Sequence, residues 1–205
     1  MIDVLIERTP YLAGGFVRNL LISAVSMGLG TGIGATLGWL RHHRFRATLR
    51  TEDMLTNLCR NVPSFVLLYY MAFMLPAEVE IAGRILAVPV WIKANLALTF
   101  PAIGFASDQA LGYFRQRANG IAGAGETFTV AWNQYFLIII MASATASVIG
   151  VDEIVGRANM VIARDDRPVF MLVTYLYVSL WFIGAGLLVS RGTLWAVRRR
   201  GPRLT

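Results

Sequence analysis

The sequence predicts an all-α integral membrane protein with about five transmembrane helices and a short amphipathic surface helix after the fourth. The composition is 56% hydrophobic and only 15% charged, and the mean hydropathy is +0.58, which is unusual for a soluble domain. The apolar residues also come in long blocks, and about 20 such residues are needed to cross a bilayer core. We therefore treat residues 1–205 as a single transmembrane domain.

The charge balance and the cysteine content exclude several other classes. The net charge is +7, but the positive residues are mostly arginines between apolar blocks, which is typical of membrane topology rather than of nucleic-acid binding. The single cysteine, Cys59, excludes an internal disulfide and a cysteine-cluster metal site. His42 and His43 have no carboxylate or cysteine partner at ligand spacing, so we expect no metal site.

Five apolar blocks define the predicted spans, at about residues 15–40, 51–75, 88–107, 128–147 and 169–190. In the first block small residues recur every four positions and so share one helix face. Such residues let helix backbones approach closely in lipid. We expect this face to pack against another helix, either in the same chain or in a second subunit. Its residues are Ser26, Gly30, Gly34 and Gly38.

The second and third blocks carry interruptions. Pro63 removes a backbone donor and predicts a kink in the second span, and Lys93 is expected to extend its ammonium group toward the membrane interface. Polar groups in or near spans usually face a bundle interior or a cavity. The candidate residues of a substrate pathway are therefore Asn61, Asn95, Asp108, Asn133 and Gln134. An equally good interpretation of Asp108 is that its carboxylate contacts cytoplasmic water and has no role in a pathway.

The end of the fourth block changes character at Gly150. Beyond it, apolar residues recur at helical spacing between charged and polar ones, which predicts a short amphipathic helix at a membrane surface or against other helices. The apolar positions are Val151, Ile154, Val155, Ala158, Val161 and Ile162.

The distribution of basic residues predicts the orientation. Cytoplasmic segments carry an excess of arginine and lysine. The segments on the two sides of the predicted spans differ in their number of basic residues. One set holds Arg41, Arg44, Arg46, Arg50, Arg115, Arg117, Arg191, Arg198, Arg199, Arg200 and Arg203. The other set holds Arg8, Arg18, Arg84, Lys93, Arg157, Arg164 and Arg167. The asymmetry places the N-terminus outside and the C-terminus in the cytoplasm.

Three passages resemble the permease subunit of polar-amino-acid ABC importers. Arg60-Asn61-Val62-Pro63 is similar to the family's Phe-Arg-Gly-Thr-Pro motif, with Asn61 and Val62 in place of glycine and threonine. Residues 104–108 resemble Ala-Tyr-x-Ala-Glu, with Phe105 and Asp108 in place of tyrosine and glutamate. Residues 147–154 resemble Ser-hydrophobe-Ile-Gly-Val-x-Glu-Leu. The resemblance covers most of the chain from the first span onward.

The predicted loop at residues 109–127 departs from the family. The family places a coupling helix with a Glu-Ala-Ala motif there, and this sequence has no such motif and a shorter loop. We expect any contact with an ATPase to involve Gly120, Gly123, Gly125 and Glu126. The alternative is that Glu126 is a solvated acid, or a first-turn residue favoured by the dipole of the fourth span.

The resemblance implies a multi-pass protein of the bacterial inner membrane that imports polar amino acids or similar small solutes by alternating access. It also implies three kinds of partner: a second permease subunit or another copy of this chain, cytoplasmic ATPase subunits, and a periplasmic solute-binding protein. The chain has no Gly-x-x-x-x-Gly-Lys-Ser/Thr motif, so we expect no bound cofactor, no enzyme activity, and ATP hydrolysis by the partners. Membrane lipid is a further expected partner of the basic tail. The alternative is a non-transporting membrane scaffold subunit descended from such a permease.

Overall fold

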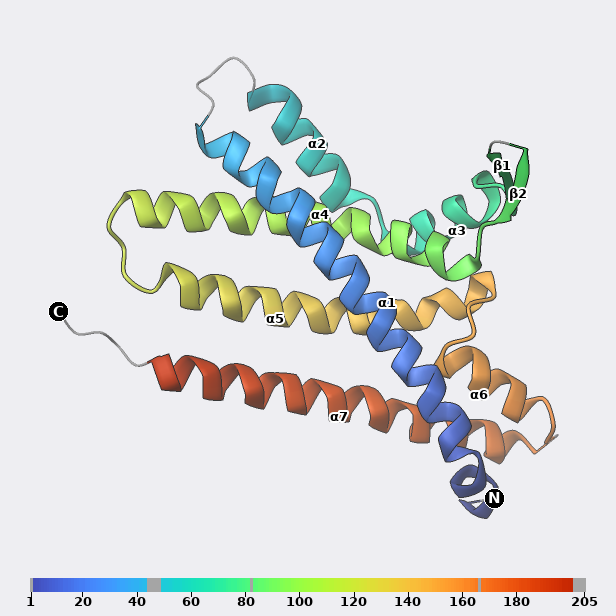
Figure 1. Ribbon diagram of the computed structural model, residues 1–205. Helices are drawn as coiled ribbons and strands as arrows, with labels where there is room; N and C mark the ends of the chain where they lie inside the picture. The colour runs from blue at the N-terminus through green and yellow to red at the C-terminus, as the bar shows by residue number, and fades with distance from the viewer. Residues whose placement is uncertain (1, 44–48, 82, 166, 201–205) are drawn as a thin grey trace.

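The computed structural model describes residues 2–43, 49–81, 83–165 and 167–200, and most of them are helical (Figure 1). The elements in chain order are α1 (Ile2–His43), α2 (Leu49–Asn61), α3 (Ser64–Met74), β1 (Glu78–Ile81), β2 (Arg84–Ala87), α4 (Val90–Ala118), α5 (Ala124–Ser143), the 3-10 helix η1 (Ala144–Ile149), α6 (Ile154–Ile162) and α7 (Pro168–Arg200). In this part of the chain four helices are long and apolar enough to cross a membrane: α1, α4, α5 continued by η1, and α7. These helices agree with the predicted all-α membrane class.

The long helices run between two ends of the molecule (Figure 1). The start of α1, the start of α7 and the hairpin of β1 and β2 lie at the right of the view, and the α4–α5 connection and the end of α7 lie at the left. We call these the hairpin end and the C-terminal end. The predicted orientation makes the hairpin end external and the C-terminal end cytoplasmic. Arg44, Arg46 and Arg203, which entered that prediction, lie outside the described residues.

The predicted second span is two helices rather than one. α2 and α3 together return the chain from the C-terminal end to the hairpin end (Figure 1), and neither alone is among the membrane-length helices. The break lies at Val62 and Pro63, because proline has no N–H to continue the helix and restricts the residue before it. At Pro63, where the sequence predicts a kink in this span, the structure has a complete break between two helices.

The connection between the third and fourth predicted spans is much shorter than expected. α4 continues to Ala118 and α5 begins at Ala124, so most of the predicted loop at residues 109–127 is helical. The chain reverses within residues 119–123, where Gly120 and Gly123 have φ values of 69° and 84°. Only glycine adopts this left-handed region at little cost. At the opposite end of α4, residues 78–81 and 84–87 pair as antiparallel strands.

α1 crosses the other long helices and packs most closely on α4. The small face of α1 lies directly on this neighbour. A Cβ atom added at Gly30 would lie 2.4 Å from the Ala102 Cβ, and one added at Gly34 would lie 2.5 Å from the Ile103 carbonyl oxygen. Added at Gly38, it would lie 2.6 Å from the Ser107 carbonyl oxygen. The glycines thus permit a backbone approach that any side chain would prevent.

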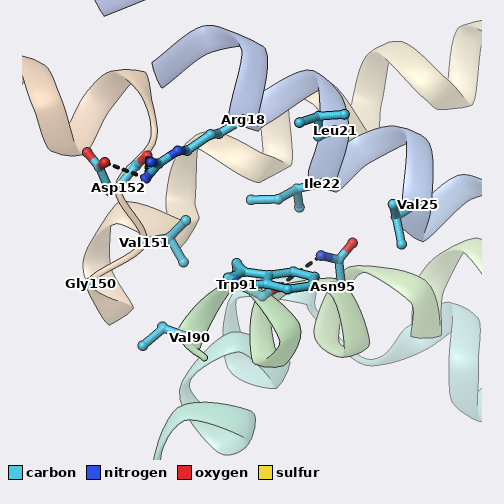
Figure 2. A pocket seen from close by; sticks show the side chains of 10 residues that line it. All are labelled: Arg18, Leu21, Ile22, Val25, Val90, Trp91, Asn95, Gly150, Val151 and Asp152. Atoms are coloured by element: carbon cyan, nitrogen blue, oxygen red, sulfur yellow. Dashed lines mark hydrogen bonds and ion pairs between the residues drawn. The ribbon is translucent and has the colours of Figure 1, made fainter. Parts of the chain in front are cut away.

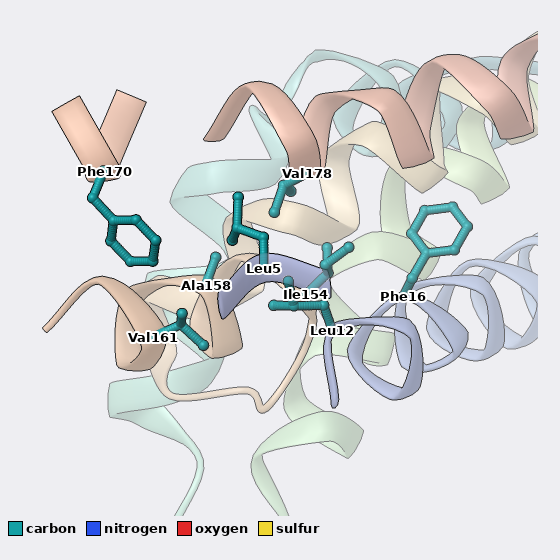
Figure 3. Packing of buried hydrophobic residues seen from close by; sticks show 8 residues of the cluster. All are labelled: Leu5, Leu12, Phe16, Ile154, Ala158, Val161, Phe170 and Val178. Atoms are coloured by element: carbon teal, nitrogen blue, oxygen red, sulfur yellow. The ribbon is translucent and has the colours of Figure 1, made fainter. Parts of the chain in front are cut away.

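α6 occupies the position of the predicted amphipathic helix, and its apolar face is covered by protein. Figure 3 shows the cluster that covers it, at the hairpin end of the molecule. The cluster consists of Leu5, Leu12 and Phe16 from α1, Ile154, Ala158 and Val161 from α6, and Phe170 and Val178 from α7. α6 therefore joins the first and last long helices.

Candidate functional site

The break between α2 and α3 lies directly on α4. A Cβ atom added at Gly104 would lie 2.8 Å from the backbone nitrogen of Arg60 and 3.1 Å from its Cα. Glycine at this position lets the end of α2 reach the α4 backbone. Asn61, the last residue of α2, is exposed at the break. Broken helices in transporters place polar groups and free backbone at membrane depth where they line a cavity.

An ion-pair network fixes α2 to its neighbours. Arg41 of α1 bridges two carboxylates, with 2.6 Å from its Nη2 to the Asp53 Oδ1 and 2.8 Å from its Nη1 to the Asp108 Oδ1. The same Nη1 donates to the Ser107 hydroxyl at 3.0 Å. Arg60 holds the other oxygen of Asp108, with 2.9 Å from its Nη1 to the Asp108 Oδ2. Only 10% of the Arg41 side chain is exposed, so removing one partner would leave a largely desolvated charge.

Lys93 holds the other end of the broken span. Its ammonium group donates to the carbonyl oxygens of Ala72 at 3.2 Å and Leu75 at 2.8 Å, which are acceptors left free where α3 ends. The side chain is buried, so its ammonium group binds backbone carbonyl oxygens of α3 and its C-cap rather than solvent. α3 is thereby tied to the first turn of α4, while α2 is tied to the middle and C-terminal half of that helix.

A pocket of about 650 Å³ opens near the hairpin end between α1, the start of α4 and residues 150–152 (Figure 2). Its lining is Arg18, Leu21, Ile22, Val25, Val90, Trp91, Asn95, Gly150, Val151 and Asp152. Most of these side chains are apolar. Arg18 and Asp152 form an ion pair at one edge, and Asn95 lies across from them beside Trp91.

Asp152 is shared by two guanidinium groups. Arg157 donates from its Nε and Nη2, each at 2.9 Å, to the two carboxylate oxygens, and Arg18 pairs with the same carboxylate. Hydrogen bonds from Arg157 lower the pKa of Asp152 below its ordinary value. The carboxylate is therefore ionised at neutral pH, and this edge of the pocket carries two positive charges for one negative charge.

A buried polar network beside this pocket was not predicted. Asn19 of α1 donates to the Ser143 hydroxyl and to the Glu153 Oε2, both at 2.9 Å, and its carbonyl oxygen accepts from the Ile154 N–H at 3.1 Å. Glu153 also accepts the N–H groups of Val155 at 3.0 Å and Gly156 at 2.8 Å. This joins α1, α5 and α6. The sequence signal was present, because Glu153 occupies the glutamate position of the matched Val-x-Glu passage.

The predicted pathway residues do not gather at one place. Asn61 lies at the break, and Asp108 belongs to the ion-pair network. Asn95 borders the pocket, where its side-chain oxygen accepts from the Ser26 hydroxyl at 3.1 Å. Asn133 and Gln134 lie on α5 and line a separate groove with α7. Within the described residues, His, Cys, Asp and Glu side chains form no group of three or more that could hold a metal ion.

The predicted coupling residues lie at the C-terminal end. Gly120 and Gly123 are exposed in the turn between α4 and α5, and Gly125 is exposed in the first turn of α5. Glu126 is half-buried in the same turn, and its backbone N–H donates to the Gly123 carbonyl at 3.0 Å. Residues 119–123 are all described and contain no separate helix between α4 and α5.

Comparison with known proteins shows the fold of the chain. The sequence matches no protein-family model and no curated protein. Among solved structures, it is similar to a chain of a crystal structure of an amino acid ABC transporter with histidines, with a TM-score of 0.74 and 15% identity over 95% of this chain and 96% of that chain. It is also similar to a chain of the MetNI methionine ABC transporter in inward-facing conformations. That match has a TM-score of 0.65 and 16% identity over 92% of this chain and 95% of that chain.

Proposed function

We propose that this chain is a translocation subunit of an ABC importer that moves amino acids or similar small solutes, with ATP hydrolysed by partner subunits. The carrying observation is the fold, which matches chains of two ABC transporters over nearly their whole length. The broken second span supports the proposal independently, because transporters use such breaks at their pathways. Asn61, with its exposed side chain, is an uncharged polar residue at this break.

The anchors of the broken span suggest how it would move. α2 and the C-terminal half of α4 form one unit through the Arg60–Asp108 ion pair, and α3 and the start of α4 form another through Lys93. A proline lies where the two units meet in each segment of the chain. Pro63 lies in the break between α2 and α3, and Pro101 lies inside α4. A proline inside a helix removes one backbone hydrogen bond and favours bending there. The two units therefore tilt against each other in alternating access.

The pocket at the hairpin end supports the solute class. The two guanidinium groups that share Asp152 leave a net positive charge at this edge, and Arg18 suits the carboxylate that every amino acid carries. The remaining lining is mostly apolar, with Asn95 as its other polar side chain. A solute with a carboxylate group and a partly apolar side chain fits this arrangement. A binding protein in the periplasm would deliver the solute to this end.

Isolation of the assembly tests the proposal. The tagged chain is expressed in its native membrane, extracted in mild detergent, and its co-purifying subunits are identified by mass spectrometry. We expect an ATPase subunit and either a second permease subunit or a second copy of this chain, with ATP hydrolysis by the complex. A chain recovered with other membrane proteins but without any ATPase would contradict the proposal.

A second candidate function is a membrane scaffold subunit that no longer couples to an ATPase. The observation that favours it is the tight α4–α5 turn, which leaves no separate helix at the position where the family resemblance places the coupling contact. Glu126→Lys tests this contact, with Glu80→Lys in the hairpin as a control of equal charge change at the opposite end. Both variants must insert at wild-type levels. Loss of ATPase association in Glu126→Lys alone supports coupling through this turn, and unchanged association removes Glu126 from the contact.

A further inference from the structure

α7 is longer than a membrane requires, and its excess lies at the C-terminal end. It has 33 residues, which correspond to about 50 Å of helix, whereas the hydrocarbon core of a bilayer is about 30 Å thick. If the helix enters the core near Pro168, its last turns pass through the head-group layer. The composition changes accordingly, from an apolar stretch ending at Ser190 to a segment rich in arginine.

One continuous face of α7 carries this change. Leu187 and Leu188 are exposed large apolar residues. The face continues through positions 191, 194, 195, 198 and 199, which follow the i, i+3, i+4, i+7 and i+8 spacing of one helix side. Every one of these five side chains is exposed: Arg191, Leu194, Trp195, Arg198 and Arg199. An apolar ridge thus leads directly into a cluster of guanidinium groups.

The cluster contains a side chain suited to a membrane interface. The Arg199 guanidinium carbon lies 3.8 Å from the centre of the Trp195 ring, and tryptophan with arginine is typical of the boundary between acyl chains and head groups. α7 contains no acidic residue. In the described part of the chain, no ion pair involves Arg191, Arg198 or Arg199. Their positive charge is therefore not neutralised by neighbouring carboxylates of this chain.

The basic end of α4 provides a contrast. Arg115 and Arg117 are also exposed at the C-terminal end of the molecule, and Arg117 lies over the Tyr113 ring. No large hydrophobic side chain of α4 beyond Leu96 is exposed, however. An acyl chain therefore has no ridge to follow toward these two arginines. Positive charge alone does not distinguish the ends of α4 and α7, but the combination of charge with an exposed apolar ridge does.

We propose that the C-terminal end of α7 is a binding site for an anionic phospholipid. The phosphate of the lipid contacts Arg198 and Arg199, its glycerol region lies at Trp195, and an acyl chain follows Leu187 and Leu188 past Arg191. Each basic residue near an anionic membrane surface favours binding by about fivefold. The site would fix the depth of α7 in the bilayer, and it does not depend on the transport function.

Quenching of tryptophan fluorescence by brominated lipids tests the site directly. The purified full-length chain, with any subunits that accompany it, is reconstituted in phosphatidylcholine vesicles containing a minor fraction of brominated phosphatidylglycerol or brominated phosphatidylcholine. The difference between wild type and Trp195→Phe isolates the signal of Trp195. We expect phosphatidylglycerol to be preferred at Trp195 in wild type. Arg198→Gln with Arg199→Gln should reduce that preference by about fivefold for each arginine removed.

Arg115→Gln with Arg117→Gln is the matched control, since it removes the same charge from another exposed helix end. Retention of the preference in this control supports the site. Equal losses in both double variants would overturn the proposal, because they would show attraction by total charge. Absence of any preference in the difference between wild type and Trp195→Phe would also overturn it, and this outcome does not depend on the arginine variants. Displacement of the lipid by inorganic phosphate, at an ionic strength matched with chloride, would identify a free-phosphate site instead.

Discussion

Arg60 of α2 donates to Asp108 of α4, with 2.9 Å between the Arg60 Nη1 and the Asp108 Oδ2. The two residues come from two of the passages that carry the family resemblance, and the fold brings them together at the broken span. Asp108 had an equally good interpretation as an acid in cytoplasmic water. Its second oxygen is also engaged, at 2.8 Å from the Arg41 Nη1. Asp108 is thus a structural bridge between α1, α2 and α4.

The two ion pairs of Asp108 are predicted to differ in strength. The Arg41 side chain is 10% exposed and that of Arg60 is 54% exposed, and water screens exposed pairs. Double-mutant cycles with Arg41→Gln, Arg60→Gln and Asp108→Asn should give a coupling of about 1–3 kcal/mol for Arg41 and less than about 1 kcal/mol for Arg60. Thermal or denaturant unfolding in detergent measures both. A larger coupling for Arg60 would contradict the burial argument.

Two neighbouring glycines of α1 make a matched pair. A Cβ atom at Gly34 would lie 2.5 Å from the Ile103 carbonyl oxygen and 2.6 Å from the Ala106 Cβ, whereas nothing lies within 4 Å of one at Gly32. Gly34→Ala should destabilise the protein by about 1–3 kcal/mol through overpacking. Gly32→Ala should leave the stability unchanged or raise it by up to about 1 kcal/mol. If the two variants melt alike, the α1–α4 contact does not depend on its glycines.

Glu153 gives a prediction for stability and its pH dependence. Glu153→Gln replaces one accepting oxygen by an NH₂ group that faces N–H donors, which should lower the free energy of unfolding by about 1–3 kcal/mol. Glu126→Gln, at a half-buried site, should lower it by less. Burial raises the pKa of Glu153 above its ordinary value of 4.5. The folded wild type therefore binds a proton more readily than the unfolded chain, and it gains stability as the pH falls through the raised pKa toward 4.5.

The glutamine variant lacks this titration, so the stability difference between wild type and Glu153→Gln should widen as the pH falls from neutral toward 4.5. Unfolding measured at several pH values checks the sign. A difference that narrows would show that the three N–H donors around Glu153 favour its ionised form more strongly than burial disfavours it.

The exposed side chain at the break is predicted to contact water. Cysteines placed singly at Asn61 and Leu58 in a Cys59→Ser background can be tested with a water-soluble thiol reagent in membranes. Both native side chains are exposed on α2, but Asn61 is assigned to the pathway and the apolar Leu58 to lipid. We expect Asn61→Cys to react at least tenfold faster, because thiolate chemistry requires water. Equal rates at the two positions would remove Asn61 from the pathway.

The sequence predicted those features that depend on local patterns. Block length and small-residue spacing identified the long helices and the packing face of α1, and Pro63 marked the irregularity in the second span. The partners of buried polar residues could not be predicted, because they depend on tertiary contacts. Lys93 near a helix end looked like a residue reaching the interface, and only the fold shows that α3 ends beside it. The extent of α4 and α5 was also missed. The glycines at 120 and 123 suggested a long irregular loop, but they form a short turn with two residues in the left-handed conformation.

Uptake into proteoliposomes is the most direct measurement of coupled transport by this chain and its partners. The chain with its co-purified subunits is reconstituted in vesicles with ATP trapped inside, and labelled amino acids are presented outside with the cognate binding protein. We predict uptake that requires hydrolysable ATP and that falls at least tenfold in a complex whose ATPase subunit carries an inactive site. Uptake that is the same with and without ATP, or no uptake by an assembly that hydrolyses ATP when solute is present, would contradict it.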